Sequence, residues 1–183
     1  MLLISFISQI FPFILLKDLR IREEIYSFAW YIFIASAFTF FDLAFIKMHI
    51  EHYFLYNAFT PIEIGFFFYI PLKLTNTNEY ENLVTAIITT CLTILIVFIM
   101  AYSNILDTKS VYIECITSLL ACGVAIGRMK HISIKDYRVW IITGISIYAV
   151  INCYTYPEYN MLANILMNIF FAIALIIYGY KKD

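Results

Sequence analysis

Glu63 lies in the stretch FTPIEIG, residues 59–65, where a proline and a carboxyl group interrupt an almost continuous apolar run. Comparable charges at the centre of a membrane-spanning helix cost about 2.5 to 3.5 kcal/mol, so Glu63 should face other helices and be protonated or held by donors or a cation. Pro61 has no backbone N–H, which leaves the carbonyl of Asn57 without its helical donor. Thr60 lies at i−3 from Glu63, on the same helix face. These residues predict a polar site near the middle of the membrane.

Other strongly polar residues fall in the same half of the predicted helices, toward the outer side. They are Asp42, Asn57, Glu114, Asn152, Asn164 and Asn168. Together with Glu63 and Thr60 they predict a narrow polar cavity or ion pathway that opens to the outside. The alternative is that buried Glu and Asn form hydrogen bonds between helices, at about 0.6 kcal/mol per contact on average. This alternative is favoured for Asn164 and Asn168, which share one helix face with Asn160.

The sequence His49-Ile-Glu51-His52 has the only metal-like spacing in the chain. It is not the H-E-x-x-H pattern, in which two histidines one helical turn apart share a face. A loop could still bring both imidazoles and the carboxylate to a metal, with Asp42 or Glu114 as a further ligand. Solvated residues at the membrane interface are the favoured interpretation, so no metal or other cofactor is predicted.

The chain also lacks the residue patterns of membrane hydrolases. Zinc-dependent seven-helix hydrolases such as ceramidases and adiponectin receptors need an H-x-x-x-H pair in the last helix, where this chain has Asn164 and Asn168. Ser36 has no histidine four residues later, no serine has a nucleophile-elbow context, and no glycine-rich phosphate loop is present among five glycines. A non-enzymatic protein is therefore predicted.

The composition indicates what surrounds the helices that position these residues. The chain has 183 residues, of which 63% are hydrophobic and 14% charged, and its mean hydropathy is +0.84. A soluble domain carries about 25% charged residues, so most of this surface must face lipid. The net charge of −1 gives no reason to expect direct nucleic-acid binding.

The apolar runs predict one all-α transmembrane domain over 1–183, with about seven spanning helices. The expected segments are 1–16, 25–46, 53–72, 83–102, 111–129, 139–156 and 161–180. The first is short and contains Pro12, so it could be tilted or lie partly in the interface. Short connections predict antiparallel neighbours in one bundle.

The distribution of Lys and Arg predicts the orientation. Ten of the twelve lie on one side of the predicted membrane, and only Lys47 and Lys109 lie on the other. The ten are Lys17, Arg20, Arg22, Lys73, Arg128, Lys130, Lys135, Arg138, Lys181 and Lys182. The richer side should be cytoplasmic, which places the N-terminus outside and the C-terminus inside a bacterial inner membrane. If the first segment does not span, only the N-terminus changes side.

Two features near the cytoplasmic side suggest contacts. Gly123 and Gly127 form a G-x-x-x-G pattern that allows close helix packing, against an internal helix or against a second copy in a homo-oligomer. The basic loop from Arg128 to Arg138 could contact anionic lipid or a cytosolic protein partner, although the positive-inside rule alone also accounts for it.

The stretches HYFLYNAFTPIEIGFFF and NILMNIFFAIALIIYGYKK resemble segments of small multi-pass inner-membrane proteins found in many bacteria. In size and helix-rich composition, the chain is also similar to the membrane accessory proteins encoded beside RNA-targeting type VI-B CRISPR effectors. The first resemblance, which covers two helices, implies no activity. The second implies an accessory role in antiviral defence.

The leading hypothesis from the sequence is a small channel or accessory protein with an outward-facing polar cavity. A proton-coupled or small-solute carrier that uses Glu63 is the first alternative. An intramembrane metal-assisted hydrolase that uses His49 and His52 is the second.

Overall fold

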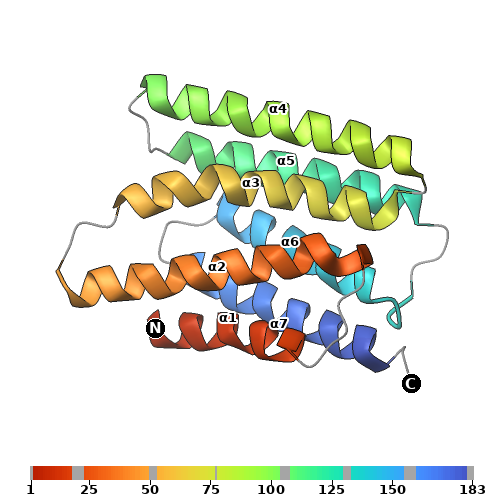
Figure 1. The fold of residues 1–183 in the computed structure, drawn as a ribbon, viewed down its shortest axis with the longest axis horizontal. Coiled ribbons are helices and arrows are strands. Elements are labelled where there is room, and N and C mark those ends of the chain that lie inside the picture. Colours follow the sequence, from red (N-terminus) through yellow and green to blue (C-terminus); the bar gives the residue numbers. More distant parts are fainter. Residues whose placement is uncertain are drawn as a thin grey trace.

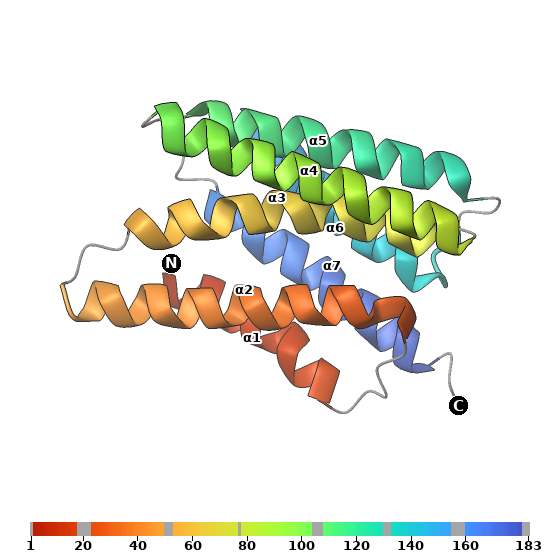
Figure 2. The same ribbon diagram turned by 45° about the horizontal axis from the view of Figure 1, so that its top comes forward.

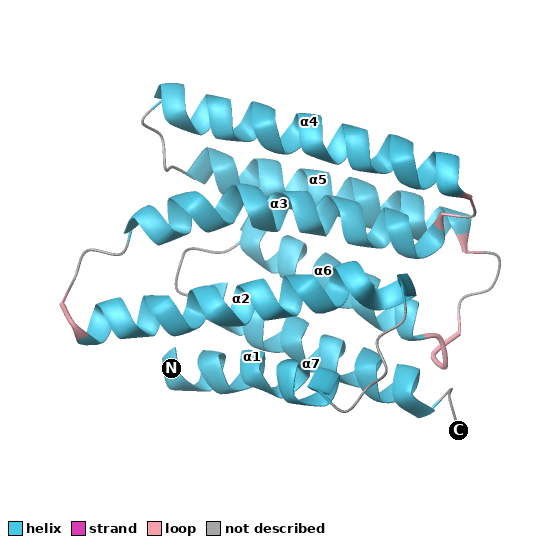
Figure 3. Cartoon of the chain, viewed as in Figure 1, coloured by secondary structure: helices cyan, strands magenta, loops and turns pink. Residues whose placement is uncertain are grey.

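The computed structural model describes residues 2–17, 23–49, 53–76, 78–103, 108–129, 133–154 and 160–180. These residues form seven α-helices (Figure 3). The helices are α1 (Leu2–Lys17), α2 (Glu23–Lys47), α3 (Tyr53–Thr75), α4 (Glu79–Ser103), α5 (Thr108–Arg128), α6 (Tyr137–Tyr154) and α7 (Asn160–Tyr180). The prediction of an all-α chain with seven helices is confirmed.

Local side-chain contacts fix several helix ends. Asn78 accepts a hydrogen bond from the backbone N–H of Glu81 at 2.8 Å, which satisfies a free donor at the start of α4. Asp136 does the same for the N–H of Arg138 at 3.0 Å at the start of α6. His49 has a left-handed φ of 54°, the conformation that commonly terminates a helix, just after α2.

The helices lie side by side as one bundle, and the two chain ends lie at opposite ends of it (Figure 1). Contacts between α1, α2, α3, α5, α6 and α7 close a ring, since α7 packs against α1 as well as against α6. Helix α3 also reaches across to α6. Helix α4 packs on α3 from outside this ring, beside α5 (Figure 2).

The ring interior is filled by large apolar side chains. Phe28 of α2 packs edge-on against Phe171 of α7, with ring centroids 4.8 Å apart. Ile141 and Ile145 of α6 are also fully buried there. Because lipid tails are as apolar as these side chains, close packing rather than the hydrophobic effect must hold such helices together within a membrane.

Three segments in the described part of the chain are long and apolar enough to cross a membrane. They are Ile25–Lys47, Glu79–Phe98 and Leu162–Tyr180. Large apolar side chains cover the outside of α4, including Leu83, Ile94 and Phe98. Soluble monomers rarely expose such a continuous apolar surface. A membrane protein is therefore plausible on these grounds, whereas the number of crossings and the orientation stay predictions.

Candidate functional site

Two carboxyl groups are buried inside the ring, and they come from different helices. Glu63 of α3 is 9% exposed and Glu114 of α5 is 4% exposed. The Tyr148 side chain of α6 lies close enough to both carboxyls to interact with them electrostatically, and the two carboxyls interact with each other in the same way. The hydroxyl of Tyr31 in α2 donates a hydrogen bond to Oε1 of Glu63 at 3.1 Å. We define Tyr31, Glu63, Glu114 and Tyr148 as the carboxyl cluster.

An aromatic ring one turn along α3 positions the two tyrosines. Phe67 follows Glu63 at i+4, so it lies on the same helix face. Its ring centroid is 5.2 Å from that of Tyr31 and 5.2 Å from that of Tyr148. Edge-on and tilted contacts of this kind hold rings in fixed orientations. The α3 face therefore supplies both a carboxyl group and the surface on which its tyrosine partners rest.

Other buried polar oxygens lie on the helices that carry the carboxyl cluster. Within the described residues, Glu114 Oε1, Ser118 Oγ and Asn152 Oδ1 are buried and have no hydrogen-bond partner. Ser118 follows Glu114 at i+4 on α5, and Asn152 follows Tyr148 at i+4 on α6. The described part of the bundle therefore has several buried polar oxygens one helical turn or less from residues of the carboxyl cluster.

No cationic side chain balances the carboxyls in the described part of the chain. The buried polar and charged residues there include Glu, Asp, Asn, Ser and Thr, but no Lys, Arg or His. Placing two uncompensated negative charges at this depth is costly, so they require a proton or a small cation. Among described residues, no group of three or more His, Cys, Asp and Glu could hold a metal ion. The cluster therefore offers two carboxyls and two tyrosine hydroxyls, which are groups that can exchange protons.

The structure brings together only some of the residues expected at one site. Glu63 and Glu114 meet in the cluster, and Asn152 lies one turn from Tyr148. Thr60 and Asp42 are half-buried, and both make contacts within the bundle. The side chain of Asn57 lies outside the described residues.

The asparagines of α7 serve a different interface. The amide nitrogen of Asn168 donates a hydrogen bond to the hydroxyl of Ser8 in α1 at 3.3 Å. Asn164, one turn earlier, is half-buried. The contact of Asn168 agrees with the structural alternative for this pair, a hydrogen bond between helices, rather than with a lining of the Glu63 site.

The metal candidate cannot be assembled from the described residues. His49 is exposed at the end of α2. Glu51 and His52 lie outside the described residues, so the proposed three-residue cluster has no described geometry. His49 alone offers a single ligand at an exposed turn.

The expected internal helix contact at Gly123 and Gly127 is wrong. A Cβ atom at either position would meet nothing within 4 Å, because both glycines face outward from α5. Close approaches occur instead at Gly65 and Gly144. A Cβ at Gly65 would lie 2.7 Å from Thr93 Oγ1 of α4, and one at Gly144 would lie 3.1 Å from Phe170 Cβ of α7. A contact of Gly123 and Gly127 with a second copy stays a prediction.

The basic loop after α5 is partly neutralised within itself. Arg138 forms an ion pair with Asp136, with 2.6 Å between Nη2 and Oδ2. Trp140 donates from Nε1 to the carbonyl of Ile134 at 2.7 Å, which holds the described end of the loop against α6. Lys135 is exposed there. A cytosolic partner at this loop stays a prediction.

The groove that the structure shows lies away from the carboxyl cluster. It is formed by α3, α4 and α5, and Arg128 and Glu81 stand at one end. The outward opening of the Glu63 site stays a prediction.

Sequence analysis missed the tyrosines of the cluster, because the chain has 15 tyrosines and the residue type alone carries no signal. The i, i+4 spacing of Tyr148 and Asn152 on α6 is the pattern that could have indicated a polar face there.

Comparisons with models of known families, with curated proteins and with solved structures gave no match for this chain. The resemblance to bacterial multi-pass proteins and to CRISPR accessory proteins therefore stays a prediction.

Proposed function

We propose that this chain is an integral membrane carrier that binds a proton or a small monovalent cation at Glu63 and Glu114 and couples its movement to a small solute. One observation supports this choice above the others. Two buried carboxyls share contacts with one tyrosine, and no described basic side chain neutralises them. Ionisable groups inside membrane bundles mark proton and ion pathways.

Burial of the pair favours a carrier over an open channel. Both carboxyls are at most 9% exposed, so an ion bound there has exchanged water for protein oxygens. A carrier needs such an enclosed site, which opens to each side in turn, whereas a conducting pore needs a continuous wet path.

Tyr148 gives the pair a route for proton movement. Its hydroxyl can accept a proton from one carboxyl while it donates its own to the other, so the number of protons is conserved. Tyr31 donates a hydrogen bond to Glu63 from the neighbouring helix α2, which stabilises the carboxylate when its proton has left.

The first test is uptake by the purified protein in liposomes under imposed proton and sodium gradients. We expect saturable cation entry that Glu63→Gln and Glu114→Gln each reduce at least tenfold, because an amide keeps the shape but cannot ionise or hold a cation. Glu79→Gln is the matched control, since Glu79 is an exposed acid at the start of α4. Folded yield must be equal in all variants. Wild-type uptake that both glutamine variants retain would contradict the proposal.

The channel and accessory hypotheses remain as a second candidate because of the outward-facing Gly123 and Gly127. Small residues on an outer face allow a second helix to approach closely, as an oligomeric pore requires. The same liposomes separate the two candidates. A channel gives single-channel currents, and its flux does not saturate at low substrate concentration. A carrier gives no single-channel currents, and its uptake saturates.

A further inference from the structure

Helices α4 and α5 leave a groove between them because each packs on α3. The groove has a volume of about 250 Å³. Its walls are apolar side chains from all three helices, chiefly Phe68, Leu72, Val84, Ile88, Leu120 and Val124. Ile88, Leu120 and Val124 are exposed at its edge. The groove is therefore open to whatever surrounds the bundle.

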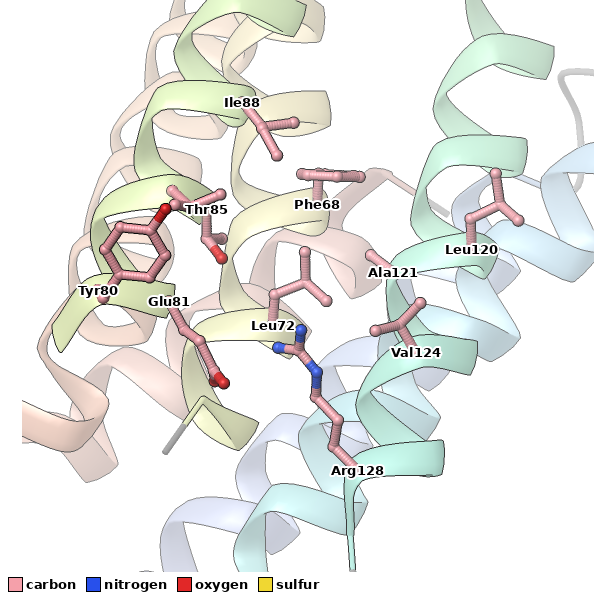
Figure 4. Close-up of a pocket in the computed structure, with 11 residues that line it drawn as sticks. Phe68, Leu72, Tyr80, Glu81, Thr85, Ile88, Leu120, Ala121, Val124 and Arg128 are labelled. Atoms are coloured by element: carbon pink, nitrogen blue, oxygen red, sulfur yellow. The ribbon is translucent and has the colours of Figure 1, made fainter. Parts of the chain in front are cut away.

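One end of the groove carries opposite charges on opposite walls. Arg128 is in the last turn of α5, and Glu81 is in the first turn of α4. Figure 4 shows their side chains pointing toward one another beside Leu72, while Phe68 and Ile88 lie toward the other end. The groove thus has a charged end and an apolar length.

A hydrogen-bond network fixes the charged end. Asn76, just after α3, accepts a hydrogen bond from the Arg128 guanidinium. The amide nitrogen of Asn76 donates to Asn82 Oδ1 and to Thr85 Oγ1, each at 3.1 Å. One asparagine therefore links α4 and α5, and holds the arginine in place. A guanidinium has five donors, so the contact with Asn76 leaves several for a ligand.

We propose that this groove binds a zwitterionic phospholipid with a primary ammonium headgroup. One acyl chain lies along the apolar walls, the phosphate binds Arg128 and the ammonium binds Glu81. The planar guanidinium of arginine matches the geometry of a phosphate group. A carboxylate has about four lone-pair sites, so Glu81 can accept hydrogen bonds from the ammonium in addition to the contact it makes within the protein. A purely anionic lipid would meet the carboxylate as a like charge, so the paired charges select the zwitterion.

The proposed binding depends on α4 crossing the membrane, and it is independent of cation transport. The charged end lies at the bundle end that the basic residues assign to the cytoplasm. The lipid would accordingly come from the inner leaflet. Failure of transport by Glu63→Gln would leave this site unaffected.

The test is native mass spectrometry of the purified protein with phosphatidylethanolamine, phosphatidylglycerol and phosphatidylcholine, each titrated separately. We expect phosphatidylethanolamine to bind more tightly than the other two. Arg128→Gln should weaken its binding roughly tenfold, the change that one charge-assisted hydrogen bond supplies. Glu81→Gln should remove the preference for phosphatidylethanolamine over phosphatidylglycerol, while a glutamine keeps the helix start intact.

Two further variants keep the result interpretable. Lys135→Gln removes an exposed positive charge outside the groove and should leave lipid binding unchanged. Val124→Trp fills the groove from its exposed edge and should abolish binding without removing a charge. Equal binding of all three lipids by the wild type, a preference for phosphatidylglycerol, or a protein bound in the groove instead of lipid would overturn the proposal.

Discussion

Tyr148 is the residue on which the two carboxyls of the cluster converge. Tyr148→Phe removes only its hydroxyl and keeps the ring that packs 5.2 Å from Phe67. The carboxyls of Glu63 and Glu114 would each lose a partner inside the bundle, so we expect the free energy of unfolding to fall by about 1 to 2 kcal/mol. Denaturant titration in detergent micelles measures this change. Tyr180→Phe is the control because Tyr180 is 80% exposed, and equal stability of the two variants would argue against the cluster.

The sequence predicted a polar site at Glu63 for a physical reason. A carboxyl group in an apolar run is costly wherever it points, so its position alone indicates a polar contact. Glu114 was also expected in the same polar cavity, although it lies 51 positions along the chain in another helix. Tyr148 was not expected there, because whether it faces the carboxyls depends on the rotation of α6, which no local pattern determines.

Helix α6 meets α7 closely at Gly144. Gly144→Leu would force a side chain toward Phe170 Cβ, Phe171 Cε1 and the carbonyl of Met167, which lie 3.1 to 3.3 Å from an added Cβ. We expect a loss of about 1 to 3 kcal/mol in unfolding free energy, since the two helices must separate. Gly127→Leu is the matched control, because a Cβ at Gly127 would meet nothing within 4 Å. The free energy of unfolding is compared between the monomeric forms of the two variants. A Gly144 variant as stable as this control would mean that α6 and α7 are not closely packed.

At the scale of helices, apolar run length was a reliable guide. The expected segment 83–102 falls within α4, and 161–180 coincides with α7 apart from its first residue. Charged and polar loops separate the runs, which is why the ends were predictable to within a few residues. The order of neighbours was not predictable, because α4 leaves the ring to pack on α3 although α5 directly follows it in sequence. Because the neighbours of α5 could not be predicted, the sequence also did not show that Gly123 faces outward.

At the scale of the whole molecule, successive helices run in opposite directions, and the chain ends lie at opposite ends of the bundle (Figure 1). The C-terminal ends of α3 and α5 and the start of α6 share one bundle end. Lys73, Arg128, Lys135 and Arg138 are therefore grouped there, whereas Lys47 belongs to the opposite end. The positions of the two chain ends and the grouping of basic residues thus agree with the predicted orientation.

This orientation predicts that the C-terminus is cytoplasmic and that the loop between α6 and α7 is outside. A fluorescent protein that folds only in the cytoplasm should fluoresce when it is fused after residue 183. A phosphatase that is active only outside the cytoplasm should be active when it is inserted at residues 155–159. Ten of twelve basic residues on the inner side oppose the reverse arrangement, because each resists translocation. A phosphatase fused to the N-terminus separates seven crossings from six, since only that end changes side if α1 lies in the interface. Phosphatase activity at the C-terminus would contradict the orientation, and with it the assignment of the Arg128 end of the groove to the inner leaflet.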